Sequence, residues 1–61
     1  MDKVVSTFRG TMMGIAETMR TNAILGSAKL VHCCRENPVI KDELIDLFEE
    51  CLKEIERKNR Q

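Results

Sequence analysis

The sequence predicts an all-α fold, and three observations lead to this prediction. Apolar residues recur at intervals of three and four through residues 38–58, which is the spacing of one helix face. The same spacing runs through residues 5–19. The chain has no Trp or Tyr and only two Phe, so its apolar content is almost entirely aliphatic side chains and Met. Because 61 residues make one domain at most, we expect residues 1–61 to form a single small helical domain.

The N-terminal half, residues 3–34, is predicted to be helical, either as one helix or as two. From Val5 to Met19 the apolar residues follow a heptad spacing. After Met19 the pattern meets polar residues, and the apolar face then resumes in a rotated position. The sequence leaves two alternatives open: one long helix that shifts its face, or a break near Thr21, where Thr21 or Asn22 caps a second helix.

A further helix is predicted over residues 38–58. Asn37 suits the N-cap, and Pro38 suits the first helical position. The preceding stretch, Val31–Val39, holds the only His, two of the three Cys and the only Pro, and we interpret it as the boundary between two helices. The apolar stripe of the helix consists of Ile40, Leu44, Leu47, Phe48, Cys51, Leu52 and Ile55.

The lengths of these helices determine how the chain assembles. One helix over residues 3–34 would be roughly 48 Å long, against roughly 30 Å for residues 38–58. A hairpin of these two helices would leave the seam from Val5 to Ile15 without a partner in the same chain, so we expect it to dimerise into a helical bundle. If the chain breaks near residue 21, the alternative is a compact three-helix domain.

Charge is balanced overall but not along the chain. Residues 1–35 carry five basic and two acidic side chains, which gives +3, whereas residues 36–61 carry five basic and eight acidic ones, which gives −3. Opposite signs favour packing of one half against the other, and against a second copy. They disfavour binding to DNA. The start of the sequence resembles no signal peptide, and no apolar run is long enough to span a membrane, so we expect a cytoplasmic protein with free thiols.

A metal or thiol site is a weaker interpretation of the cysteines. His32, Cys33, Cys34 and Cys51 are four nitrogen and sulfur ligands of the kind that zinc prefers. Consecutive residues of a helix, however, point about 100° apart, so the first three cannot converge on one ion. We therefore predict no metal and no cofactor. The sequence supports no Ser/His/Asp or Cys/His arrangement beyond lone residues, so we also predict no enzymatic activity.

The sequence predicts a small regulatory or adaptor protein that binds another protein through its helices, most simply as a homodimer. Gly10 and Gly14, four residues apart, indicate either a close contact between helices or a tolerated weak spot. The predicted interface residues, for a dimer or a client protein, are Val5, Phe8, Met12, Met13, Ile15, Met19, Leu44, Phe48, Cys51 and Ile55, with the client ridge around Phe8, Met12 and Met13. The alternatives are a dimer that binds RNA through Lys3, Arg9, Arg20 and Lys29, and a protein that depends on its thiols or a metal.

Overall fold

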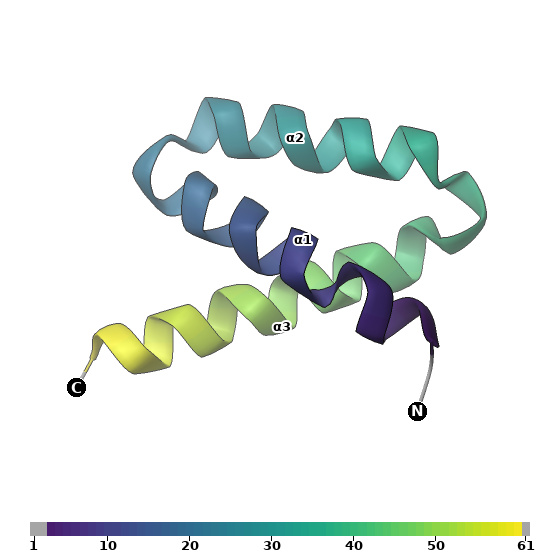
Figure 1. Cartoon of the computed structure of the whole chain (residues 1–61). Coiled ribbons are helices and arrows are strands. Elements are labelled where there is room, and N and C mark those ends of the chain that lie inside the picture. The colour runs from purple at the N-terminus through teal and green to yellow at the C-terminus, as the bar shows by residue number, and fades with distance from the viewer. Residues whose placement is uncertain (1–2, 61) are drawn as a thin grey trace.

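Three α-helices and one short 3-10 turn make up nearly all of the described chain (Figure 1). A computed structural model describes residues 3–60, with the side chain of residue 4 left aside. The elements are α1 (Lys3–Thr21), α2 (Ala23–Glu36), η1 (Pro38–Ile40) and α3 (Lys41–Asn59). Residues 3–60 contain no strand, so the predicted all-α fold is confirmed.

The chain reverses at Asn22, between α1 and α2. Asn22 has an extended backbone (φ −149°, ψ 94°), and its Oδ1 accepts a hydrogen bond of 3.1 Å from the backbone N–H of Leu25. This is an N-cap, because it satisfies a donor that the first turn of α2 leaves unpaired. At the end of α1, the Thr21 hydroxyl donates to the Thr18 carbonyl at 3.1 Å. Of the two alternatives, the break near residue 21 is therefore confirmed, and the three-helix alternative replaces the two-helix hairpin.

A glycine allows α1 and α2 to approach closely beside this turn. Gly26 is buried, and a Cβ atom built on it would lie 2.5 Å from the Cα atom of Met19. No side chain fits at that distance without moving the backbone of α1. Gly10 and Gly14 differ, since a Cβ on either would meet no atom within 4 Å.

Asn37 lies between α2 and η1, and its side chain bonds to the end of α2. Its side chain makes no capping bond to η1. Its Nδ2 instead donates to the carbonyl of Cys33 at 2.9 Å, and its backbone N–H donates to the carbonyl of Cys34 at 3.3 Å. Asn37 thus occupies the predicted N-cap position, and its carbonyl accepts from the backbone N–H of Ile40 at 3.2 Å, but its side chain does not make the capping bond that the prediction implies. The reason is that the last carbonyls of α2 need donors, and the Asn37 amide lies within reach of them. Pro38 does begin the next element, which tightens into η1 before α3 starts at Lys41.

The core lies mainly between α1 and α3. Its buried residues are Met12, Ile15 and Ala16 from α1 and Leu44, Leu47, Phe48 and Cys51 from α3. In Figure 1, α1 runs between α2 and α3. The heptad seam of α1 is therefore covered by α3 of the same chain, and an uncovered seam no longer gives a reason for dimerisation.

The three helices form a flat body rather than a closed bundle. Its principal extents are 35 × 29 × 15 Å, and its radius of gyration is 11.3 Å. A compact chain of this length would have a radius of gyration of about 10.5 Å. The helix α2 packs on α1 and meets α3 only weakly, so much of its surface has no neighbour in the chain.

Two glycine substitutions test the contact beside Asn22. We expect Gly26→Ala to lower the free energy of unfolding by about 1–3 kcal/mol, because the new methyl group overlaps the backbone of Met19. Gly14→Ala is the matched control, and it should raise the free energy of unfolding by up to about 1 kcal/mol, because alanine favours a helix and has open space there. Urea unfolding followed by circular dichroism measures both. Equal effects of the two substitutions would contradict this packing.

Candidate protein-binding surface

The residues predicted from the sequence to form an interface lie in or beside the core of the single chain. Met12, the centre of the predicted client ridge, is 0% exposed. Ile15, Leu44, Phe48 and Cys51 are also buried, while Val5, Phe8, Met13, Met19 and Ile55 are partly buried and pack against the core. The structure therefore brings these ten residues together, but within one chain. A partner would reach only the margins of this set.

The basic residues of the RNA alternative do not form one open face. The guanidinium of Arg9 pairs with Glu54 at 2.6 Å, from Nη2 to Oε2. The guanidinium of Arg20 lies against the side chain of Asn59, whose oxygen accepts from it when the amide is turned to face it. Both arginines thus contact α3. Lys3 and Lys29 are exposed but belong to different helices.

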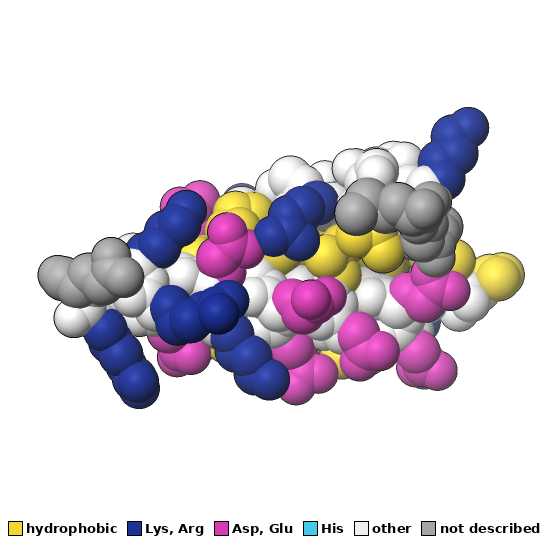
Figure 2. Space-filling view, turned by 90° about the horizontal axis from the view of Figure 1, so that it is seen from below, with side chains coloured by type: hydrophobic (Ala, Val, Ile, Leu, Met, Phe, Trp, Pro, Cys, Tyr) yellow, Lys and Arg dark blue, Asp and Glu magenta, His cyan; other side chains and the backbone are white. Residues whose placement is uncertain are grey.

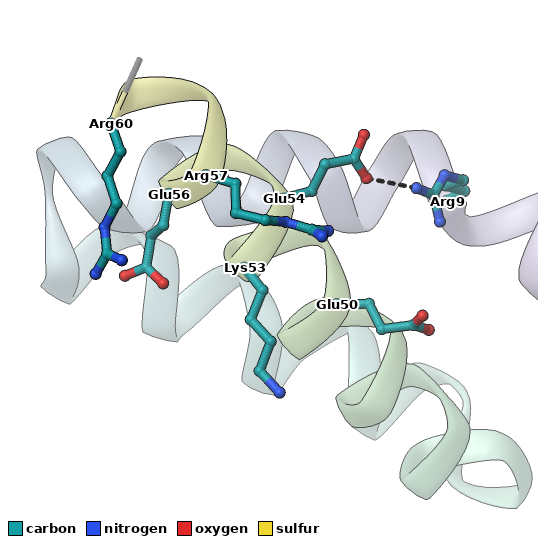
Figure 3. A pocket seen from close by; sticks show the side chains of 7 residues that line it. All are labelled: Arg9, Glu50, Lys53, Glu54, Glu56, Arg57 and Arg60. Atoms are coloured by element: carbon teal, nitrogen blue, oxygen red, sulfur yellow. Dashed lines mark hydrogen bonds and ion pairs between the residues drawn. The ribbon is translucent and has the colours of Figure 1, made fainter.

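The hollow beside the Arg9–Glu54 pair carries charges of both signs (Figure 3). It has a volume of about 540 Å³ and is lined by Arg9, Lys53, Arg57 and Arg60 and by Glu50, Glu54 and Glu56. Figure 2 shows the same mixture of basic and acidic side chains on the face seen from below, with hydrophobic side chains in a band between them. Among the described lining residues, four cations beside three carboxylates leave little net field for a phosphate, and none has an aromatic ring on which a base could stack. We interpret this region as a solvated, ion-paired surface.

The cysteines are separate free thiols in the described chain. Cys33 and Cys34 are half-buried on α2, and Cys51 is fully buried in the core. Among residues 3–60, no three His, Cys, Asp or Glu side chains gather closely enough to hold a metal ion. Burial raises the pKa of the Cys51 thiol; the charge of Arg9 opposes this rise, and Glu54 and Glu50 add to it. Burial and the neighbouring Cys34 likewise raise the pKa of Cys33.

A wide groove of about 740 Å³ separates α1 from one side of α2. Gly10 and Gly14 line it together with Ile15, Ala28 and His32. The close helix contact that the two glycines indicated is not made within the chain, since nothing lies within 4 Å of either Cβ position. Their weak helix propensity therefore has no compensating contact in the described structure.

A strongly apolar hollow lies where α2 turns into α3, and we call it the corner groove. It has a volume of about 550 Å³ and is lined by Leu30, Val31, Cys34, Pro38 and Ile45, with Arg35 and Lys41 as its charged residues. Val31 is 48% exposed and Ile45 is 37% exposed, and Val39 next to the groove is 96% exposed. Large apolar side chains gathered in a hollow and rimmed by charge are typical of a site that binds another protein.

The rotation of α2 explains why the corner groove is open. Leu30 and Cys34 are half-buried and pack against the core. Val31 follows Leu30 by one residue and so points about 100° away from it. Since α2 has only α1 along most of its length, no element of the chain covers Val31.

Sequence reasoning did not select Val31 and Ile45 as site residues. One signal was present for Val31, because the apolar face of the N-terminal half resumes in a rotated position beyond residue 22. A second was present for Ile45, which is apolar but lies off the stripe of its helix, between Asp42 and Glu49. An apolar residue outside the core stripe marks a possible contact surface.

Comparisons with known proteins give no relative: no protein-family model, curated protein sequence or solved structure matches this chain. Within residues 3–60, none of the helices is both long and apolar enough to cross a membrane.

Thiol alkylation tests the placement of the cysteines. At neutral pH we expect iodoacetamide to modify Cys51 much more slowly than Cys34, because Cys51 is fully buried and its raised pKa keeps the thiol protonated. Urea should remove the difference. The raised pKa also means that the unfolded chain releases this proton first, so stability should fall as the pH rises above the ordinary thiol pKa. Mass spectrometry of peptides gives the rates, and equal labelling of the native protein would contradict the buried position of Cys51.

Proposed function

We propose that this chain is a small, non-enzymatic regulatory or adaptor protein that contacts another protein through its helices and works as a homodimer. The contact surface in this proposal is the corner groove. The observation that carries it is the exposure of Val31 and Ile45 beside a core that is complete without them.

The energetics of burial support a protein partner. Covering a Val or Ile side chain completely contributes about 1.5–3 kcal/mol relative to leaving it in water. Val31, Ile45 and Val39 are 48%, 37% and 96% exposed, so a partner that covers them gains the corresponding share of this free energy at each side chain. The charged residues that line the groove, Arg35 and Lys41, leave its floor apolar, as in protein interfaces with an apolar centre and a polar rim.

The helix α2 is the natural element for this contact. It packs on one neighbour only, and its outer side is free over several turns. Ile24 is seven residues before Val31, so both lie on the same side of the helix, and Ile24 is also exposed. The apolar surface thus extends from the corner groove along α2, which suits contact with an extended element such as a helix.

The two other interpretations have less support. RNA binding would use Arg9 and Arg20, and both are engaged with α3. A thiol-dependent activity needs a reactive thiolate, whereas the pKa values of Cys33 and Cys51 are raised. Three free thiols fit a reducing compartment, which supports our proposal of a cytoplasmic location.

Crosslinking from two matched positions tests the proposed function. A photoreactive amino acid replaces Val31 in one variant and Leu25 in the other, in cells that naturally produce the chain. Leu25 is the control because it is 45% exposed on the same helix but does not line the corner groove. We expect position 31 to capture a defined protein chain in high yield, and position 25 to capture little.

The substitutions Val31→Glu and Leu25→Glu give a second comparison at the same positions. We expect Val31→Glu to reduce capture, read out from a probe at Val39, by about tenfold or more, because it places a charge in an apolar contact. Leu25→Glu should have little effect, since an acid in the first turn of α2 suits the helix dipole. Circular dichroism should show both variants folded. Loss of capture in both variants, or in neither, would contradict the corner groove as the contact surface.

A further inference from the structure

We propose that the corner groove is occupied by a second copy of this chain, related to the first by a two-fold axis that passes near Ile45. This inference rests on the proposed function, because it takes the corner groove as a contact surface and names the partner there.

The surface around the groove carries charge of both signs, arranged on two sides. Arg35, on α2, and Lys41, at the start of α3, are the charged residues that line it. On α3, Asp42 and Glu49 lie three residues before and four residues after Ile45, so all three share one side of the helix. The α2 side of the surface, where Lys41 also lines the groove, is therefore basic, and the α3 side with the two acids, which do not line the groove, is acidic.

These charges have no partners within the described chain. Arg35, Lys41, Asp42 and Glu49 form no ion pair within 4.0 Å with any other residue of 3–60, whereas Arg9 and Lys58 both pair with Glu54. All four of these unpaired residues are exposed. They are thus available to a partner that presents the opposite arrangement.

A second copy presents that arrangement. In a two-fold contact the same surface meets itself, so each residue of one chain faces the reciprocal residue of the other. Rotation about an axis near Ile45 places the basic α2 side of one chain opposite the acidic α3 side of its copy. Arg35 and Lys41 of each chain then face Asp42 and Glu49 of the other. Val31 and Ile45 of both chains meet at the centre.

The mixed signs of the surface select this occupant over others. A uniformly acidic helix would attract Arg35 and Lys41 but would meet Asp42 and Glu49 with repulsion, and a basic partner would have the reverse problem. Size also allows it, because a stable interface needs about 800 Å² from each partner. The chain has a surface of 4549 Å², so this is less than a fifth of it.

Charge reversal tests the proposal with the purified chain alone. One variant carries Arg35→Glu and Lys41→Glu, and the other carries Asp42→Lys and Glu49→Lys. We expect the unaltered chain to be a dimer by sedimentation equilibrium at about 0.1 mM. Each variant alone should associate at least about tenfold more weakly, because like charges then face each other across the interface. An equimolar mixture of the two should form a heterodimer, detected by its mass in native mass spectrometry.

Two controls separate loss of association from loss of folding. The variant Glu56→Lys with Arg60→Glu changes the same kinds of charge in the hollow lined by Arg9, away from the corner groove, and should leave the dimer intact. Ile45→Gln removes apolar contact at the proposed axis without changing charge, and should weaken the dimer while its circular dichroism stays helical. Together they show whether the groove itself carries the contact.

The results also distinguish the second copy from another protein. A monomer at about 0.1 mM, or a dimer that none of the charge reversals weakens, overturns the proposed occupant. If the chain is monomeric but position 31 captures a different protein in cells, the corner groove remains the protein-binding surface of the proposed function, but the homodimer and the second copy in the groove are both excluded. If the chain is monomeric and position 31 captures nothing, both proposals fail.

Discussion

The reversal of the chain at Asn22 determines which apolar residues are buried and which face solvent. Its side chain caps α2, and the missing side chain of Gly26 lets α2 return closely along Met19. Without this turn, α1 and α2 would continue as one long helix, and the seam that contains Met12 would extend beyond the reach of α3. With it, α1 lies between the other two helices, and a single chain encloses its own core.

The same turn leaves α2 incompletely covered. Because α2 packs on α1 and meets α3 only weakly, the body is flat, with a smallest extent of 15 Å. Val31 consequently points into solvent beside Ile45, where the corner groove opens. In such a small domain the core supplies only a few kcal/mol, so covering this groove would add appreciably to stability as well as to binding. The corner groove, which is open because α2 is incompletely covered, is thus the surface that we propose to bind a partner.

Sequence periodicity predicted the helices and the composition of the core, but not which helix covers which face. The spacing of Met12 and Ile15, and of Leu44 and Phe48, places each pair on one face of its helix, and all four residues are buried. Periodicity reports the faces of a helix without identifying the neighbour, so a core within one chain and a core between two chains have the same pattern. Val31 was missed for this reason, because its exposure depends on the weak contact between α2 and α3. The break at Asn22 involves a side-chain hydrogen bond to Leu25 and the close approach at Gly26, and neither of these is part of the apolar pattern.

Isotope-filtered nuclear Overhauser spectroscopy on a mixture of labelled and unlabelled chains tests this account most directly, since it separates contacts within a chain from contacts between chains. The account predicts that Met12 contacts α3 within one chain, and that contacts between chains appear only around Val31 and Ile45. Contacts between Met12 of one chain and α3 of another would contradict it. They would mean that the helices exchange between chains and that the core is shared by two copies.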